Sequence, residues 1–251
     1  MRIGIVIGTR PEVMKNYAIV QALRAAEVDF FVLHTNQHQD PLLRETIFSQ
    51  MGYAPDFIFP QPYSVGAAID WVCDLIHPLQ IGLLLVNGDT AASIIGAIAA
   101  VYSDVGLVHV EAGLRAFDNC MYEERNRIMV DSAAHYLFTY TQHHAEYLNK
   151  IPDLRGRIFN VGNTTIDLIQ DFSAELVKLR SDRYAYITLH RKEFTDSRAK
   201  MIDVFSTLNT LADEFDAMIF PMHPRTRATM KDHGLSLDLL SRITVIDSVD
   251  P

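Results

Sequence analysis

Short apolar runs alternate with helix-like stretches along the first part of the chain. The runs cover residues 3–7, 30–33, 81–86, 107–110, 136–140 and 158–161. This alternation is typical of a parallel β-sheet covered by helices, in which each crossover returns the chain to the same end of the sheet. We therefore predict an α/β domain over residues 1–165.

A second, shorter set of elements follows a helical connector. The pattern over residues 164–183 is helical, with Ile166, Ile169 and Phe172 on one side. Strand-like runs then occupy residues 184–189, 217–221 and 243–246, with helix-like stretches over 198–214 and from 225 onward. Three strands are few for a doubly wound domain. We expect residues 184–251 to form an incomplete second α/β domain, linked to the first by residues 166–183.

Polar residues follow the predicted strands at the points where each strand ends. Thr9 and Arg10 follow the first strand, residues 36–38 the second, residues 87–89 the third, and Glu111 the fourth. In open α/β sheets, ligands bind outside the carboxyl ends of the strands. The sequence therefore predicts a ligand site at this edge.

The first helix begins with a capping pattern and two cations. Thr9 and Glu12 are three residues apart, the spacing of a capping box. Arg10 and Lys15 lie in the first turns of the same helix, where the positive end of the helix dipole disfavours cations. A bound phosphate would reverse this effect, so the pair indicates an anion site, with solvated surface cations as the alternative.

Composition and charge narrow the classes of partner. The chain has 49% hydrophobic and 21% charged residues, with a formal net charge of −9. We therefore expect neither nucleic acid nor anionic lipid as a general partner, and any anion must be held by local cations. The first apolar run is too short for a signal peptide, and no run approaches the roughly 18 apolar residues of a membrane span. We expect a cytoplasmic protein without membrane contact.

Three carboxylates are predicted to meet at the ligand edge: Asp89, Glu111 and Glu123. Like charges in one site raise one another's pKa, and this can supply both an acid and a base near neutral pH. Structural roles are the alternatives. Asp89 can act as a helix N-cap, and Glu123 can form a helical pair with Arg127.

The second domain offers two histidines at successive strand ends. His190 is followed by Arg191 and Lys192, and His223 by Pro224 and Arg225. This arrangement favours a second phosphate-binding face. No dinucleotide fingerprint or P-loop is present, and we expect no cofactor. We also expect no metal, because His34, His38 and Asp40 lack the helical spacing of a metal site.

Taken together, the segments at these positions resemble one family. They are Gly8-Thr9-Arg10-Pro11-Glu12, Gln37-His38, Gly88-Asp89-Thr90, His109-Val110-Glu111-Ala112-Gly113-Leu114-Arg115, Glu123-Glu124-Arg125-Asn126-Arg127, His190-Arg191 with Glu193, and His223-Pro224. In this order, over nearly the whole chain, they resemble the non-hydrolysing UDP-N-acetylglucosamine 2-epimerases. Family members run further than Pro251, and Tyr122 stands where they usually have proline.

The resemblance implies an α/β fold with two Rossmann-like domains as in GT-B glycosyltransferases, the second incomplete here. It also implies a UDP-sugar substrate in the interdomain cleft and a homodimer. It assigns acid/base roles to Asp89, Glu111 and Glu123, and places His190 near the departing diphosphate. We expect the remaining family positions to bind substrate: Arg10, Lys15, Gln37, His38, Arg115, Arg127 and His223.

The implied reaction is epimerisation at sugar C2, from UDP-GlcNAc to UDP-ManNAc, through elimination of UDP and a 2-acetamidoglucal. Two alternatives remain open. A hydrolysing epimerase would release free ManNAc and UDP, and a truncated protein would bind the nucleotide sugar without catalysis.

Overall fold

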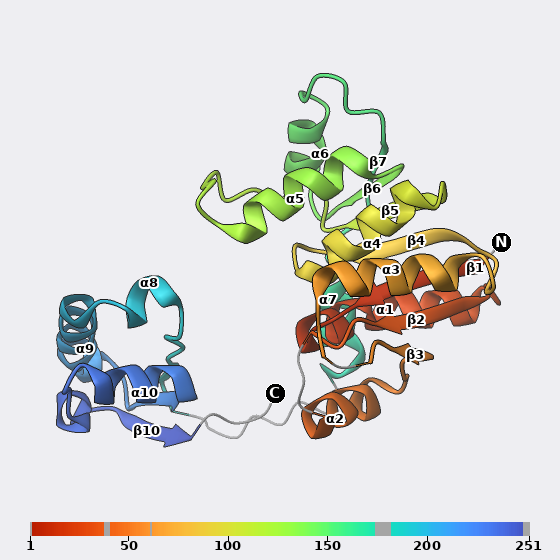
Figure 1. Ribbon diagram of the computed structural model, residues 1–251. Helices are drawn as coiled ribbons and strands as arrows, with labels where there is room; N and C mark the ends of the chain where they lie inside the picture. The colour runs from red at the N-terminus through yellow and green to blue at the C-terminus, as the bar shows by residue number, and fades with distance from the viewer. Residues whose placement is uncertain (1, 38–40, 61, 174–181, 248–251) are drawn as a thin grey trace. The chain divides into compact units, whose positions relative to one another are not determined.

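The chain divides into two compact units, Met1–Leu176 and Val177–Pro251. The computed structural model describes residues 2–37, 41–60, 62–173 and 182–247 (Figure 1). Each unit is an α/β structure with its own sheet and its own core.

Strands and helices alternate throughout the N-terminal unit. The elements are β1 (Arg2–Ile7), α1 (Arg10–Ala25), β2 (Phe30–His34), α2 (Pro41–Met51), β3 (Phe57–Ile58), α3 (Val65–Ile76), β4 (Ile81–Asn87), α4 (Ala91–Tyr102), β5 (Gly106–Val110), α5 (Tyr122–Ala133), β6 (Tyr136–Thr139), α6 (Gln142–Leu148), β7 (Arg157–Asn160) and α7 (Thr164–Asp171). The parallel-sheet prediction for this region is confirmed.

Within the described part of this unit, seven strands form one parallel sheet in the order β3-β2-β1-β4-β5-β6-β7. The strand order reverses between β1 and β4. At such a switch point the two flanking crossovers leave in opposite directions, which opens a crevice at the carboxyl ends of the two strands. The loops that begin at Gly8 and Gly88 therefore border the expected ligand crevice.

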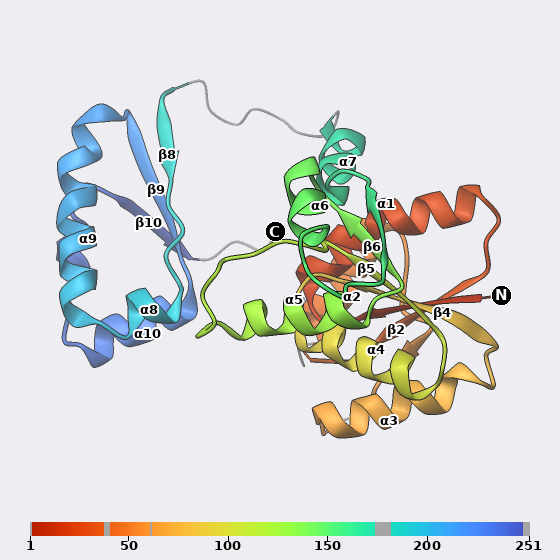
Figure 2. The same ribbon diagram turned by 90° about the horizontal axis from the view of Figure 1, so that it is seen from above.

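Two apolar layers hold this sheet between helices. On one face, α3 and α4 pack on the sheet through residues such as Val72, Ile76 and Ile95. On the other face, α1, α2 and α7 contribute Val13, Val20, Phe48 and Leu168. Figure 2 shows α3 and α4 on one side of the sheet and α1 and α7 on the other.

Gly96 lets α4 lie close to the sheet. A Cβ at this position would collide with Cγ1 of Val86 and lie 3.3 Å from Cβ of Val6. The close approach fixes the start of α4, and with it the loop between β4 and α4, against the two central strands.

In the N-terminal unit the predicted strands agree with the observed ones to within one residue at each end, with one omission. β3 has only two residues, at the edge of the sheet, which is too short for a hydrophobic pattern to reveal. The helix predicted over residues 164–183 is described as α7 to Asp171, and residues 174–181 lie outside the described residues. The ring of Phe172, just after α7, lies edge-on to Tyr17 of α1 at 5.5 Å.

The C-terminal unit contains a smaller parallel sheet. Its elements are β8 (Tyr184–Tyr186), α8 (Lys192–Thr195), α9 (Arg198–Leu211), a 3₁₀ turn (Ala212–Glu214), β9 (Ala217–Met222), α10 (Pro224–Asp232), a second 3₁₀ turn (Leu237–Leu240) and β10 (Thr244–Asp247). Among the described residues the strand order is β10-β9-β8. Met218, Phe220 and Met222 of β9 point to one face and pack with Met201 and Phe205 of α9. β8 is shorter than the predicted strand: its register with β9 ends at Tyr186, with one further hydrogen bond from Ile187 N to Ile219 O at 2.8 Å.

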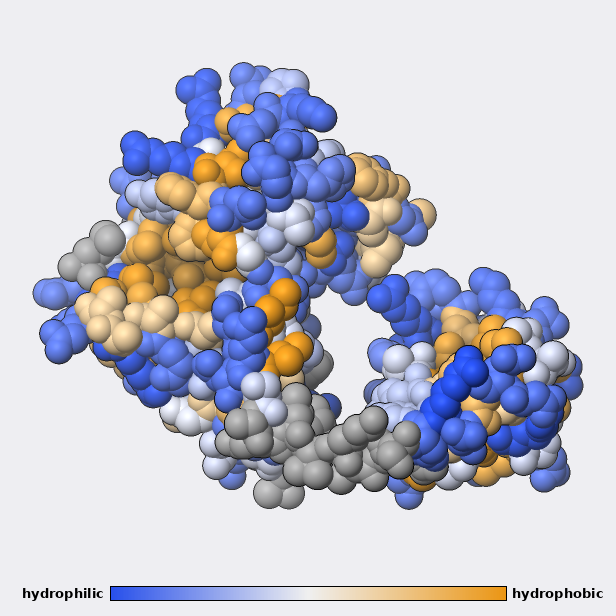
Figure 3. All heavy atoms as spheres, turned by 180° about the vertical axis from the view of Figure 1, so that it is seen from behind, coloured by the Kyte–Doolittle hydropathy of each residue, from blue (hydrophilic) through white to orange (hydrophobic). Residues whose placement is uncertain are grey.

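On the face seen in Figure 3, hydrophilic side chains surround an apolar area on the N-terminal unit. Exposed apolar side chains of the N-terminal unit include Phe159, Val161, Ile166 and Ile169. Every helix within the described ranges is too short or too polar to cross a bilayer.

Candidate active site

The carboxylate of Glu12 joins the two loops at the switch point. Its Oε2 accepts hydrogen bonds from the backbone N–H groups of Gly8 and Thr9 and from the Thr9 hydroxyl, each at 2.9 Å. Its Oε1 accepts a hydrogen bond from Thr90 Oγ1 at 2.7 Å. The predicted capping box between Thr9 and Glu12 is confirmed. Glu12 therefore ties the start of α1 to the start of α4.

Burial raises the pKa of Glu12 above its ordinary value, although its hydrogen bonds to Thr90, Gly8 and Thr9 act in the opposite direction. Its side chain is fully enclosed by the two loops. Glu12 is thus a structural carboxylate beneath the crevice.

Asp89 is not the N-cap of α4. Thr90 takes that position, and its hydroxyl accepts a hydrogen bond from Ala92 N at 3.1 Å. The alternative that explained Asp89 as a cap is therefore wrong. The carboxylate of Asp89 instead forms an ion pair with Arg127 of α5, and its backbone carbonyl accepts a hydrogen bond from Asn126 Nδ2 at 2.7 Å.

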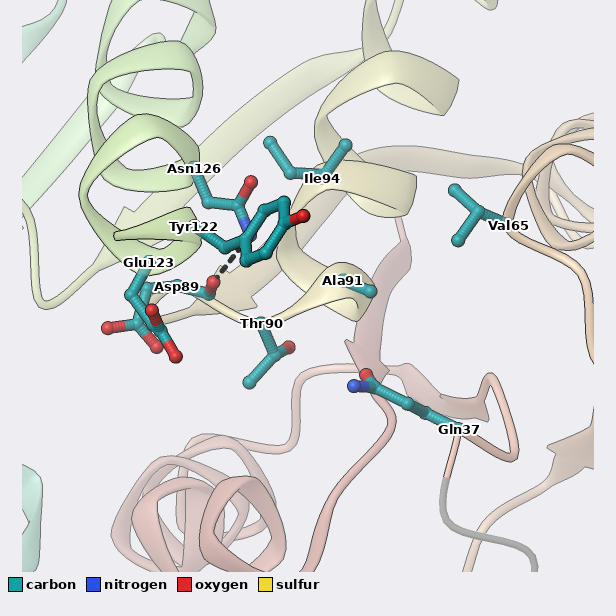
Figure 4. Close-up of a pocket in the computed structure, with 9 residues that line it drawn as sticks. All are labelled: Gln37, Val65, Asp89, Thr90, Ala91, Ile94, Tyr122, Glu123 and Asn126. Atoms are coloured by element: carbon teal, nitrogen blue, oxygen red, sulfur yellow. Dashed lines mark hydrogen bonds between the residues drawn. The ribbon is translucent and has the colours of Figure 1, made fainter. Parts of the chain in front are cut away.

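A pocket of about 410 Å³ opens beside Asp89. Its lining residues are Gln37, Val65, Asp89, Thr90, Ala91, Ile94, Tyr122, Glu123 and Asn126. Figure 4 shows Asp89 and Glu123 side by side at one end of the pocket, with Val65 at the other. The pocket thus combines two carboxylates with an apolar wall from Ala91, Ile94 and Val65, which suits a ligand with both polar and apolar parts.

Glu111 lies against the neighbouring glycine. A Cβ on Gly88 would be 3.0 Å from Glu111 Oε2 and 3.5 Å from Lys15 Nζ, and the φ angle of Gly88 is +79°. Glu111 has a φ of 74°, a left-handed conformation that costs a non-glycine residue energy and is concentrated at functional sites. Lys15 Nζ donates a hydrogen bond to Glu111 Oε2 at 2.5 Å. Lys15 and Glu111, 96 residues apart, therefore form an ion pair that the sequence analysis did not anticipate.

Glu123 and Glu124 have different surroundings. Glu123 is exposed at the pocket, whereas Glu124 is 2% exposed and accepts hydrogen bonds from the backbone N–H groups of Ala116 and Phe117 at 2.8 and 3.3 Å. The proposed helical pair between Glu123 and Arg127 is replaced by a pair between Glu124 and Arg127 at 3.5 Å. Glu124 is thus structural, and Glu123 is left facing the pocket.

The other predicted substrate contacts in this unit have varied positions. Arg10 is partly buried in the first turn of α1, and Gln37 lines the pocket. Arg115 is buried, with its Nη2 donating to Asp131 Oδ2 at 2.6 Å and its guanidinium 5.1 Å from the Tyr147 ring centroid. His38 lies outside the described residues.

The two histidines of the C-terminal unit meet each other. The rings of His190 and His223 stack with their centroids 5.3 Å apart, and both side chains are exposed. Partial burial, then the neighbouring His190 and the Arg225 cation, lower the pKa of His223 below its ordinary value.

Sequence reasoning missed Tyr140, Asn126 and Asp131 near this site. Burial, followed by the charge of Glu111, raises the pKa of Tyr140 above its ordinary value. Asn126 follows from helix geometry, since it lies three residues after Glu123 on the same face of α5. Asp131 gave no signal, because its partners lie on β5 and in the loop that follows it.

The chain is similar to known epimerases over most of its length. Residues 21–251 match the family model described as UDP-N-acetylglucosamine 2-epimerase. The chain is 30% identical over 272 residues to UDP-N-acetylglucosamine 2-epimerase of Methanocaldococcus jannaschii, covering 99% of this chain and 74% of the relative. It is 31% identical over 265 residues to UDP-2,3-diacetamido-2,3-dideoxy-D-glucuronate 2-epimerase of Pseudomonas aeruginosa, covering 99% of this chain and 73% of the relative.

The structural comparison agrees. The crystal structure of the Methanocaldococcus jannaschii UDP-GlcNAc 2-epimerase in complex with UDP-GlcNAc and UDP matches with a TM-score of 0.84 and 29% identity, covering 99% of this chain and 74% of that chain. The predicted fold class is confirmed by this likeness and by the parallel sheets. The chain belongs to the UDP-N-acetylglucosamine 2-epimerase family.

Proposed function

We propose that this protein epimerises a UDP-2-acetamido sugar at C2, converting UDP-GlcNAc to UDP-ManNAc. The observation that carries the proposal is the gathering of Asp89, Glu111 and Glu123 at the β1/β4 switch point of a chain in this family. Asp89 and Glu123 line one pocket, and Glu111 lies against the glycine that precedes Asp89.

The proposed reaction proceeds in two halves. A carboxylate takes the proton from C2, the electron pair of that C–H bond forms a C1–C2 double bond, and the C1–O bond breaks so that its electrons leave with UDP. The intermediate is 2-acetamidoglucal. In the second half, UDP adds back to C1 while a carboxylic acid delivers a proton to the opposite face of C2.

Inversion at C2 requires proton-exchanging groups on both faces of the sugar, and this explains the need for more than one carboxylate. Developing negative charge on the departing diphosphate is stabilised by cations. Arg10 and Lys15 at the start of α1 are suited to this role, and Lys15 already serves as the counter-ion of Glu111 at 2.5 Å. We propose that His190 and His223, whose rings stack on each other in the C-terminal unit, also bind phosphate.

The names and bound ligands of the relatives support UDP-linked sugars with a 2-acetamido group as the substrate class. The Methanocaldococcus jannaschii relative is described in complex with UDP-GlcNAc and UDP, and the Pseudomonas aeruginosa relative is named for a diacetamido glucuronate. The mixed lining of the pocket fits this class, because an acetamido group has a methyl group beside polar atoms. We propose UDP-GlcNAc as the first substrate to test.

Product analysis tests the proposal and separates it from hydrolysis. The 251-residue chain is incubated with UDP-GlcNAc, and UDP-ManNAc, free ManNAc and UDP are quantified by NMR. Accumulation of UDP-ManNAc toward a constant ratio with UDP-GlcNAc supports the proposed epimerisation. Release of free ManNAc with stoichiometric UDP would show the hydrolysing reaction in place of the proposed epimerisation. The absence of any product from folded protein would contradict both reactions.

A further inference from the structure

His109 is enclosed near the end of β5, two residues before the strained Glu111. Its side chain is fully buried. Nδ1 lies 2.6 Å from Asp131 Oδ1, and Nε2 lies 2.9 Å from the backbone carbonyl oxygen of Gly88. Both partners present oxygen acceptors, since Asp131 is a carboxylate and Gly88 offers a carbonyl. A proton must therefore lie on Nε2, and another between Nδ1 and Oδ1.

The neighbours of Asp131 decide where that second proton resides. Asp131 Oδ2 accepts hydrogen bonds from Arg115 Nη2 at 2.6 Å and from Gly113 N at 3.2 Å. Burial raises the pKa of Asp131, but the hydrogen bonds and charges of His109 and Arg115 outweigh burial and hold that pKa below its ordinary value. Asp131 therefore stays ionised, and the proton belongs to the imidazole.

The other end of this chain of contacts is the loop that carries Asp89. Gly88 N donates a hydrogen bond to Val110 O at 3.0 Å, and Gly88 O receives the one from His109 Nε2. Both polar groups of the Gly88 backbone are thus attached to β5. Asp89 follows Gly88 on the loop, and Glu111 follows Val110 directly after β5.

Helix α5 secures the same loop at three points along its length. Asn126 donates to the backbone carbonyl of Asp89, Arg127 pairs with the carboxylate of Asp89, and Asp131 acts through His109 on Gly88. A displacement of α5 would therefore move the carboxylate of Asp89 relative to that of Glu111.

We infer that His109 and Asp131 form a buried imidazolium–carboxylate pair that positions Asp89 and Glu111 for proton transfer. The existence of the pair follows from the contacts above, whereas its effect on proton transfer rests on the proposed epimerisation. His109 and Asp131 are positioning residues, because they act on the carboxylates through Gly88 and α5.

Nitrogen-15 NMR of histidine-labelled protein tests the existence of the pair without any substrate. At about neutral pH, both ring nitrogens of His109 should carry protons in the wild type, because both face acceptors. In Asp131→Asn, the ring should become a neutral tautomer with its proton on Nε2. A neutral His109 in the wild type would overturn the inferred pair whether or not the protein is an epimerase.

Kinetics of Asp131→Asn test the positioning role. Misplaced catalytic groups slow chemistry more than binding, so kcat for epimerisation should fall about 10- to 100-fold while KM changes little. Asp70→Asn, an exposed carboxylate on α3, is the matched control and should behave as wild type. An unchanged kcat in a folded Asp131→Asn variant with a neutral His109 would refute positioning, and His109→Gln provides a second variant if Asp131→Asn is unstable.

Discussion

Glu123 and Glu124 are adjacent residues of α5 with different tasks. Glu123 faces the pocket beside Asp89, whereas Glu124 is buried and holds the backbone of Ala116 and Phe117. Replacing an acid/base carboxylate typically slows a reaction about 10²- to 10⁴-fold. We therefore expect Glu123→Gln to lose turnover in this range at an unchanged melting temperature.

Glu124→Gln should instead lower the melting temperature, because one amide group cannot accept both backbone hydrogen bonds as strongly as a carboxylate does. Calorimetric melting and turnover of both variants measure the difference. A Glu123→Gln variant with wild-type turnover would remove Glu123 from the proposed chemistry.

Arg10 tests the anion site at the start of α1. Hydrogen bonds to charged groups contribute about 1.5 to 3 kcal/mol, so Arg10→Ala should weaken UDP binding by that amount in titration calorimetry. Arg24→Ala is the matched control, since Arg24 lies in the last turn of the same helix and bonds to the Gly52 carbonyl. Equal UDP affinity for Arg10→Ala and wild type would show that Arg10 is a solvated surface cation and does not bind the anion.

Residue identity alone predicted only part of this site. Asp89 and Glu111 could be placed because each lies in the residues just after a predicted strand, and parallel strands end at one edge. The sequence offered Asp89 as a possible N-cap of α4, whereas Thr90 takes that position, and both residue types are good N-caps. It gave no sign of the contact between His109 and Asp131, which are 22 residues apart and meet only through the packing of α5 on β5.

At the scale of elements, the loop between β4 and α4 sets the distance between two proposed catalytic carboxylates. Gly88→Ala would add a Cβ at 3.0 Å from Glu111 Oε2 in a backbone with φ of +79°. We expect the added methyl group to displace the Glu111 carboxylate and to reduce kcat by about 10-fold or more.

Gly52→Ala is the control for backbone strain. Gly52 also has a positive φ, +66°, but an added Cβ there meets nothing within 4 Å. Both substitutions should cost about 1 to 2 kcal/mol of stability, measured by urea unfolding, because left-handed backbone disfavours alanine. Similar turnover in the two variants would show that crowding at Glu111 does not matter.

The attachment of α5 to β5 should show in the pH dependence of stability. Asp131 has a lowered pKa in the folded chain, with His109 and Arg115 as the cause that outweighs burial. Such a carboxylate stabilises the folded chain at pH values above its ordinary pKa of about 3.9. This stabilisation is lost as the pH falls through the lower pKa that the group has in the folded chain.

The free energy of unfolding of the wild type should therefore exceed that of Asp131→Asn by about 3 to 5 kcal/mol at neutral pH, which is the cost of breaking a buried ion pair. The gap should narrow only below about pH 4. Urea unfolding over this range measures the gap, and one that already closes between about pH 5 and 7 would mean that Asp131 is not stabilised as a carboxylate.

For the whole molecule, sequence patterns gave the alternation of strands and helices and the existence of two units. They could not give the strand order, because a crossover can place the next strand on either side of its predecessor. The reversal between β1 and β4 is what brings Thr9 and Asp89 to one crevice. The two-residue β3 escaped prediction because it is too short for a pattern.

The homodimer implied by the family resemblance is a prediction about the whole molecule. Light scattering during size-exclusion chromatography measures it directly. A mass of twice 28.4 kDa is the expected result, and a single-chain mass at all concentrations would contradict it.

In the proposed mechanism, catalysis breaks and re-forms the C2–H bond of the sugar. This mechanism is tested by incubating UDP-GlcNAc with the chain in deuterated water and following C2 by NMR. The proposed elimination predicts deuterium at C2 of the UDP-ManNAc formed and, with time, at C2 of the UDP-GlcNAc pool. Both incorporations should be much slower in Glu111→Gln. Formation of UDP-ManNAc that retains its original C2 hydrogen would contradict the mechanism.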